Sequence, residues 1–255
     1  AVVDGEVFCG EWGTGIFAWS PSSATWSERN NRLWNTSVHD AVQRGAGPMM
    51  ERVAATFANG VFRRGPMTPA WRRANAGLDT GMGVEGFFSA LAVNSAGTVF
   101  LGTEARGGHA NIYRLRSGQN TWEPLKLAGF DGENILDLAI SPRDQNLMYA
   151  PRGSGAAGVY RSTNGGTTWT FQSFPIQACG TFDVEAHPQS RLVAYACAWN
   201  GFLRTTNGGA SWARVPNFNP SLLAIRSVAI DAANPLRIWV ATTYDGLYRT
   251  VNGGT

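Results

Sequence analysis

Aromatic and charged side chains gather around glycine-containing turns, and they are the residues best suited to bind a ligand. The aromatic candidates stand in such turns or in a long irregular stretch, at Trp12, Trp34, Phe57, Trp199 and Tyr244. The charged candidates lie in two glycine-rich turns, at Glu104, Arg106 and Arg152. Aromatic rings can stack on the apolar faces of sugars while charged groups hydrogen-bond to hydroxyls. This set therefore predicts a binding site for a glycan; the alternative is that the rings seal gaps inside the fold.

Asp137 and Asp183 form the candidate acid–base pair, because they occupy the same place in two similar apolar stretches. The stretches read I-L-D-L-A-I at 135–140 and T-F-D-V-E-A at 181–186, and each predicts a short β-strand. His39 or Asp40 falls near this place in an earlier stretch, and Ser227 in a later one. Two carboxyl groups can serve as acid and base in glycoside hydrolysis. The alternative is that they line a polar, hydrated channel.

Other reactive chemistry leaves little trace in the sequence. No phosphate-binding loop, nucleophile triad or zinc-type spacing of Cys and His occurs, so we expect neither a cofactor nor a metal site. Cys179 and Cys197 flank a predicted turn and could form a disulfide in an oxidising compartment. Two buried thiols are the alternative, and Cys9 is expected to pack within a strand.

The composition excludes several classes of protein. Charged residues make up 15 % of the 255 residues and the net charge is +3, without any Lys/Arg run, so we expect no nucleic-acid partner. No apolar stretch approaches the ~18 residues of a membrane span. The chain begins at Ala and shows no signal peptide, which fits a processed secreted protein or equally a trimmed sequence. A secreted, periplasmic or cell-surface location is therefore expected.

One twelve-residue stretch recurs along the chain and must position these candidates. It reads G-V-Y-R-S-T-N-G-G-T-T-W at 158–169, returns as G-F-L-R-T-T-N-G-G-A-S-W at 201–212, and begins again at Gly246. Weaker copies end at Trp26, Trp71 and Trp122, so successive closing tryptophans stand 43 to 51 residues apart. A period of this length indicates structural repeats. Within each copy, N-G-G predicts a tight hairpin turn, and the tryptophan is expected to pack back over the hairpin and against the next repeat.

The recurring stretch resembles the Asp-box, S/T-x-D/N-x-G-x-T/S-W, of bacterial neuraminidase-type repeats. The residues that fill it are Ser162, Asn164, Gly166, Thr168 and Trp169; then Thr205, Asn207, Gly209, Ser211 and Trp212; and finally Thr250, Asn252 and Gly254. The same box is found in sialidases, xyloglucanases, sortilin-type receptors and photosystem II assembly-factor-like propellers. The resemblance implies a β-propeller fold, and it specifies no single function because the box looks alike in all these proteins.

The repeats predict an all-β protein made of one β-propeller domain, residues 1–255. Each period reads as four short antiparallel strands, which is the form of a propeller blade. We expect six blades, near residues 1–28, 29–73, 74–125, 126–172, 173–215 and 216–255; a seventh follows if the termini are incomplete. The turns between second and third strands, which carry most of the aromatic candidates, are expected to line one face.

The family comparisons disfavour catalysis. Sialidases use an arginine triad and a Tyr–Glu pair, and no such triad can be picked out here. Xyloglucanases of this type place two catalytic Asp in a cleft between two propellers, which one propeller cannot build. We therefore predict a non-catalytic binding or scaffold module for a glycan or protein partner. The alternatives are a glycoside hydrolase using Asp137 and Asp183, and a structural or assembly subunit joined through open blade edges at the termini.

Overall fold

The computed structural model shows a chain built from β-strands and turns. It describes residues 2–3, 6–11, 15–20, 22–28, 30, 37–45, 50–57, 59–68, 70–79, 87–104, 112–125, 134–218 and 224–255, with side chains from residue 16 onward except that of Glu104. These residues contain no helix. They divide into two compact units, Ala1–Gly132 and Glu133–Thr255.

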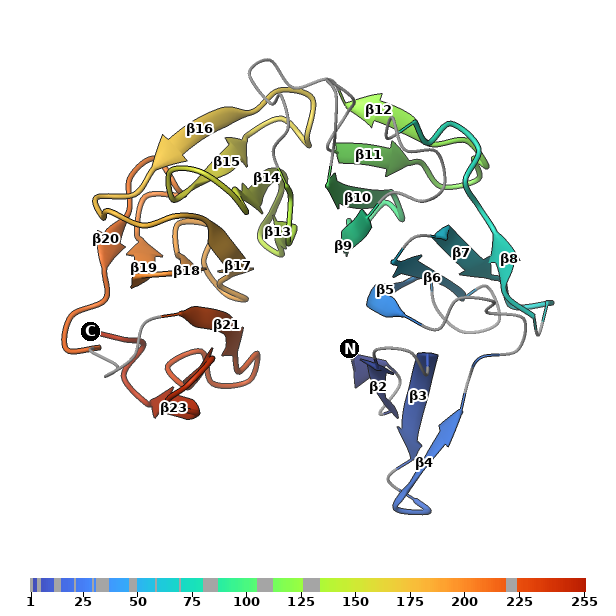
Figure 1. The fold of residues 1–255 in the computed structure, drawn as a ribbon, viewed down its shortest axis with the longest axis horizontal. Coiled ribbons are helices and arrows are strands. Elements are labelled where there is room, and N and C mark those ends of the chain that lie inside the picture. The colour runs from blue at the N-terminus through green and yellow to red at the C-terminus, as the bar shows by residue number, and fades with distance from the viewer. Residues whose placement is uncertain are drawn as a thin grey trace. The chain divides into compact units, whose positions relative to one another are not determined.

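The first unit contains three four-stranded antiparallel sheets in its described residues, and each sheet is a simple meander (Figure 1). The strands of the first sheet are β1 (Val2–Val3), β2 (Glu6–Glu11), β3 (Gly15–Ser20) and β4 (Thr25–Glu28). Those of the second are β5 (Val38–Arg44), β6 (Glu51–Thr56), β7 (Gly60–Arg64) and β8 (Arg72–Arg73). Those of the third are β9 (Phe87–Val93), β10 (Val99–Glu104), β11 (Ile112–Leu115) and β12 (Glu123–Leu125).

The second unit contains two further meanders of four strands and one of three. The first is β13 (Ala139–Ser141), β14 (Asp144–Pro151), β15 (Gly158–Ser162) and β16 (Thr170–Ser173). The second is β17 (Thr181–Ala186), β18 (Ala194–Ala198), β19 (Gly201–Thr205) and β20 (Ala213–Arg214). The third is β21 (Ile225–Ile230), β22 (Ile238–Thr242) and β23 (Leu247–Thr250). The all-β class and the four-strand repeat are thus confirmed, while the number of blades stays a prediction.

One strand is shorter than its sequence predicts. The stretch 135–140 was expected to be a strand throughout, but β13 begins only at Ala139. Ile135 still forms an isolated bridge with Arg152. Residues 136–138 lie outside the strand. The apolar pattern that predicted a strand there therefore continues without the strand pairing.

The recurring box closes a hairpin through side-chain hydrogen bonds. The Ser162 hydroxyl accepts from the Gly166 amide at 2.9 Å, and the Asn164 Oδ1 accepts from the Thr168 amide at 2.8 Å. Thr205 and Asn207 repeat both contacts, at 2.9 and 3.0 Å. The hydroxyl and the amide side chain therefore satisfy turn N–H groups, as a capped turn requires.

The second glycine of the box is required both by its backbone conformation and by its neighbour. Gly209 has φ +80°, and a Cβ added there would lie 2.4 Å from a ring carbon of Tyr149. Gly118 has nearly the same φ, +78°, and no atom within 4 Å of an added Cβ. We expect Gly209→Ala to lower the free energy of unfolding by about 3 kcal/mol, and Gly118→Ala by only about 1 kcal/mol, because only the first adds overpacking to backbone strain. Thermal denaturation of both variants measures this difference; equal losses would show that the ring contact is unimportant.

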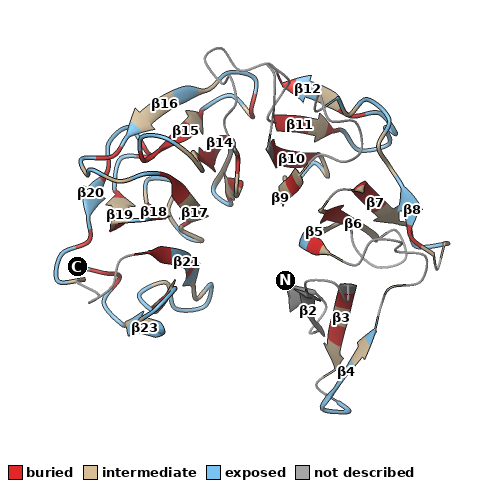
Figure 2. Ribbon diagram, in the orientation of Figure 1, coloured by how far each residue is buried: buried red, intermediate tan, exposed pale blue. Residues whose placement is uncertain are grey.

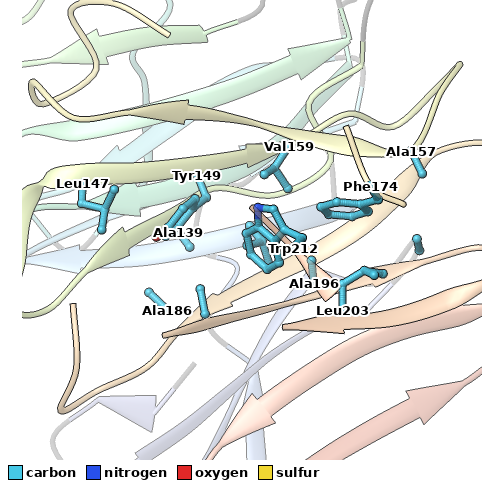
Figure 3. Close-up of a cluster of buried hydrophobic side chains, with 13 residues drawn as sticks. Ala139, Leu147, Tyr149, Ala157, Val159, Phe174, Ala186, Ala196, Leu203 and Trp212 are labelled. Carbon is cyan, nitrogen blue, oxygen red and sulfur yellow. The ribbon is translucent and has the colours of Figure 1, made fainter. Parts of the chain in front are cut away.

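Three of the box tryptophans pack against the preceding sheet, not the next one as the sequence predicted. Trp212 lies 5.9 Å from Tyr149 and 5.3 Å from Phe174 between ring centroids (Figure 3). Tyr149 belongs to β14 of the sheet before it, and Phe174 directly follows β16 of that sheet. Trp122 joins a core with Val61 of the second sheet, and Trp71 one with Ile16 of the first. In these three repeats, one large buried ring fastens the repeat to its predecessor.

In the sheets formed by β5–β8, β9–β12, β13–β16 and β17–β20, burial follows the order of the strands. The middle strands carry mostly buried side chains, whereas the two residues of β8 and the two of β20 are exposed (Figure 2). All five residues of β18 are buried. The core therefore lies between neighbouring sheets, and the turns at the ends of the strands are left to carry a binding surface.

Candidate ligand-binding site

A β-bulge near the start of the first strand of four sheets presents one extra side chain. The pairing register skips one residue between Thr181 and Asp183 in β17, and between Ile225 and Ser227 in β21. The skipped residues are Phe182 and Arg226. The equivalent bulges in β5 and β9 skip His39 and Ser89. A bulge takes one residue out of the regular alternation of the strand, so these four side chains lie near the strand ends outside that alternation.

The Trp199 cluster is the name used here for an aromatic and cationic surface formed by Phe182, Trp199, Arg226, Thr243 and Tyr244. The Arg226 guanidinium carbon lies 4.2 Å from the Phe182 ring centroid and 5.7 Å from that of Trp199. Arg226 Nε donates to Thr243 Oγ1 at 2.9 Å. Trp199 is 42 % exposed, and Tyr244, next to Thr243 in the chain, is 65 % exposed. The Phe182 and Trp199 ring centroids lie 6.1 Å apart, and a cation beside both rings is held in place by cation–π attraction.

The guanidinium of Arg226 keeps donors available for a ligand. Arginine has five N–H donors, and only the Thr243 contact uses one among the residues described. Over those same residues, no carboxylate forms an ion pair with it. The two rings and Thr243 hold the guanidinium in place, so its remaining donors are suited to bind a carboxylate or a pair of hydroxyls.

Backbone hydrogen bonds connect the turn that carries Trp199 to the segment that carries Thr243 and Tyr244. The Ala224 amide donates to the Trp199 carbonyl at 2.8 Å, and the Thr243 amide donates to the Ala224 carbonyl at 2.9 Å. Ala224 is fully buried and has φ 103°, a region that residues other than glycine rarely adopt. Such strain persists only where surrounding contacts enforce it. The turn that carries Trp199 is therefore fixed to the next sheet.

The first unit contains a similar but smaller aromatic group. The rings of Phe57 and Phe87 meet edge to face with centroids 4.4 Å apart, and His39 lies 5.8 Å from Phe57. Phe57 and His39 occupy the same places in their sheet as Trp199 and Phe182 do in theirs. Partial desolvation lowers the pKa of His39, which favours a neutral ring at pH 7. Both units thus contain an aromatic turn residue beside the extra side chain of a β-bulge.

The remaining predicted ligand-binding residues are not all placed. Trp12, Trp34 and Arg106 lie outside the described residues, and so does the side chain of Glu104 at the end of β10. Arg152 stacks its guanidinium on Phe171, 5.2 Å from the ring centroid, and Phe171 belongs to β16 at the edge of its sheet.

Sequence reasoning missed Phe182 and Arg226, although each directly precedes a residue that it had aligned. The residue composition of a strand does not show where the strand has a bulge. The signal that could have found them was the recurrence of a bulky or charged residue just before the aligned Asp or Ser position.

The aligned carboxylates bond to the backbone of the following sheet. Asp183 Oδ2 accepts from the Val228 amide at 2.7 Å, and Asp137 Oδ2 accepts from the Val184 amide at 2.9 Å. In the first unit, Asp40 Oδ2 accepts from the Leu91 amide at 2.6 Å. Asp40, not His39, is therefore the equivalent of the other two. Asp40 and Asp183 each fasten one first strand to the next, and Asp137 fastens the segment before β13 to β17.

Asp137 and Asp183 also contact each other. Burial, the negative charge of Asp183 and a hydrogen bond with its carboxylate hold the pKa of Asp137 well above its ordinary value. A protonated Asp137 can donate to Asp183, as in other carboxyl pairs that share a proton. Carboxyl groups that bond directly lie closer than the roughly 5 Å or more that separates the two carboxyl groups of glycosidases. The observed contact therefore favours a structural role for this pair.

The acidic groups near this pair make the stability of the second unit depend on pH. Burial and the charge of Asp183 raise the pKa of Glu185 to about 7. The folded protein then binds a proton more readily than the unfolded chain between pH 4.5 and 7, so the free energy of unfolding falls as pH rises through this window, by at most about 3 kcal/mol. We expect a lower melting temperature at pH 7.5 than at pH 5. Glu185→Gln should flatten the profile, and an unchanged profile would contradict this assignment.

Cys179 and Cys197 are free thiols, so the disulfide alternative is wrong in this structure. Cys197 is buried in β18, but Cys179 is exposed, so the expectation of two buried thiols holds for one of them. Across the described ranges, no three His, Cys, Asp or Glu side chains gather to hold a metal ion. In the same part of the chain, no helix has the length and apolar character needed to cross a membrane.

Comparison with known proteins gives partial matches. No family model matches the chain. A xyloglucanase from Paenibacillus sp. is 24 % identical over 192 residues, which cover 59 % of this chain and 19 % of that enzyme. The chain thus spans about a fifth of the length of this curated relative.

Solved structures resemble the chain over nearly its whole length. An ancestral GH74 enzyme has a TM-score of 0.77 and 16 % identity, with 97 % of this chain and 35 % of that one covered. The extracellular domain of a one-component system from B. thetaiotaomicron has a TM-score of 0.73 and 12 % identity, with 98 % and 32 % covered. YCF48 bound to D1 peptide has a TM-score of 0.65 and 15 % identity, with 92 % and 72 % covered.

Structural similarity at sequence identities this low supports the fold but not the activity. The recurring box, the antiparallel four-stranded sheets and these similarities together identify the chain as a β-propeller protein.

Proposed function

We propose that this protein is a non-catalytic binding propeller that recognises a glycan through the Trp199 cluster. The observation that carries the proposal is the exposed Trp199 beside an Arg226 guanidinium stacked on Phe182, with Tyr244 exposed next to them. The rings offer a face on which a sugar can stack, and the guanidinium offers paired donors to its hydroxyl or carboxylate oxygens. The sequence similarity to a xyloglucanase supports a carbohydrate as the ligand class.

Residues 1–255 are proposed to form one propeller of six blades. Its sheets repeat one connectivity along the chain, and the neighbours that support the fold match it from end to end. A location outside the cytoplasm is proposed with it, since one neighbour is an extracellular domain.

The experiment that tests the proposal is a glycan array, probed with the labelled protein beside an array of peptides. We expect saturable binding to a restricted group of glycans and none to the peptides. Binding to peptides alone would overturn the glycan assignment and favour a protein partner. YCF48, a neighbour of similar fold, is bound to a peptide, which is the observation that favours this second candidate.

A glycoside hydrolase remains the other alternative, because the matched curated relative is named a xyloglucanase. The candidate carboxyl groups, Asp137 and Asp183, hydrogen-bond to each other and to backbone amides. Incubation with xyloglucan and assay of new reducing ends distinguishes the two functions. Release that disappears in Asp137→Asn would refute the non-catalytic proposal.

A further inference from the structure

Two arginines stand directly opposite each other at the outer edge of the second sheet. Arg63 of β7 pairs with Arg72 of β8, which is the outermost strand of that sheet (Figure 1). Side chains paired in this way have Cβ atoms about 5 Å apart, and like charges at such positions are destabilising. Three other sheets place an acidic or a neutral residue opposite the equivalent arginine, in the pairs Arg114 with Glu123, Arg161 with Thr170 and Arg204 with Ala213. The second sheet therefore has an excess of positive charge at a place where its counterparts have none.

The nearest carboxylate does not neutralise both arginines. Glu51 of β6 pairs with Arg63 Nη2 at 2.6 Å and with Arg44 Nε at 2.5 Å, so two guanidinium groups already share its single charge. Arg72 is exposed, and its side chain forms no hydrogen bond or ion pair with the residues that the structure describes. Three arginines and one glutamate leave this group with a net charge of +2.

A cavity of about 340 Å³ opens beside these arginines. Its polar lining includes Glu51, Arg63, Thr68, Arg72, Asn75 and Asn120. Asn120 comes from the segment between β11 and β12 of the third sheet, and its Oδ1 accepts from Arg63 Nη1 at 3.0 Å. This contact orients the Asn120 amide nitrogen as a further donor beside the guanidinium. Because ligand pockets commonly have volumes of roughly 300 Å³ or more, the cavity can hold an anionic group together with part of the molecule that carries it.

We infer that this cavity binds a doubly charged oxyanion, phosphate or sulfate, either as the free ion or as the terminal group of a small molecule. Guanidinium groups bind such oxyanions through two parallel hydrogen bonds. An anion bound by Arg63 and Arg72 together would offset their repulsion, and its two charges would balance the net charge of +2. A single carboxylate would balance only half of it. The site lies in the first unit and includes no residue of the Trp199 cluster, so it is independent of the proposed function.

The test is a calorimetric titration with sodium sulfate at pH 7.5, with chloride added to keep the ionic strength constant. We expect saturable binding that weakens at least tenfold in Arg72→Thr, which copies the pair of Arg161 with Thr170. Arg143→Thr is the matched control, because Arg143 is exposed in the other unit and its loss changes the net charge equally. This control should bind sulfate like the wild type. Without sulfate, Arg72→Thr should melt no lower than the wild type, because it removes a like-charge pair.

A second variant and a second ligand sharpen the test. Arg72→Glu copies the pair of Arg114 with Glu123, whose side chains form an ion pair at 2.8 Å. This variant should melt higher than the wild type and lose sulfate binding altogether. Glucose 6-phosphate, titrated beside inorganic phosphate, distinguishes the two sources of the anion. Tighter binding of the sugar phosphate would assign the rest of the cavity to the organic part of the ligand, and equal binding would identify the free ion.

Three outcomes would overturn the inference. The first is no saturable binding of sulfate by the wild type. The second is retained binding in Arg72→Thr, or an equal loss in Arg143→Thr, which would mean that sulfate responds only to net charge. The third is a lower melting temperature of both Arg72 variants without any anion, which would mean that the fold itself needs this arginine.

Discussion

Replacing Arg226 with alanine is expected to weaken ligand binding by about a hundredfold, which corresponds to roughly 3 kcal/mol. The change removes the donors that would contact the ligand and the cation beside Phe182 and Trp199. It also frees Thr243 Oγ1 from its hydrogen bond with Arg226. Titration calorimetry with a glycan that binds the wild type measures the effect.

Arg226→Lys is the matched comparison for this prediction. Lysine keeps the positive charge but lacks the planar fork that stacks on rings and binds two oxygens at once. We therefore expect it to recover only a small part of the lost affinity. Full recovery by lysine would mean that charge alone attracts the ligand, and that the stacked geometry is not used.

The second large effect is expected in stability. Asp183→Ala should lower the free energy of unfolding by about 3 kcal/mol, because it removes the carboxylate that accepts from the Val228 amide and leaves that buried N–H without its partner. The backbone at Val228 is enclosed by the core of the last sheet. For a chain of this size, such a loss corresponds to a fall in melting temperature of roughly 6 to 12 °C.

Asparagine and serine variants separate the causes of this loss. Asp183→Asn keeps an oxygen that can accept from Val228 and should cost much less than alanine. Ser227 occupies the equivalent position in β21 and is exposed, so Ser227→Ala should change stability by less than about 0.5 kcal/mol. A loss of equal size at both positions would show that the carboxylate bond between strands contributes little.

The fold could be predicted further from the sequence than the site could. The recurring Gly–Trp stretch gave the strand meander, because tight turns and one large ring per repeat are local features that the sequence states directly. The direction of tryptophan packing was not predictable in this way. Whether Trp212 packs forward or backward depends on the twist and stacking of whole sheets, and no local pattern encodes that.

The sequence predicted the turn residues of the site but not its bulge residues. Trp199 and Tyr244 stand before glycines and were visible as exposed candidates. Phe182 and Arg226 appear to the eye as ordinary members of alternating strands, and only the pairing register shows that each is the extra residue of a bulge. The role of Asp183 was also hidden, since its partner is a backbone amide 45 residues away.

The measurement that most directly tests the Trp199 cluster as the binding surface is a glycan array probed with the wild type, Trp199→Ala and Trp26→Ala. Trp26 is 49 % exposed and packs on Trp19 in the first sheet, so it controls for the loss of an exposed indole elsewhere. We expect the wild type and Trp26→Ala to bind the same glycans and Trp199→Ala to lose them. Retention of binding by Trp199→Ala at the wild-type level would contradict the proposed site.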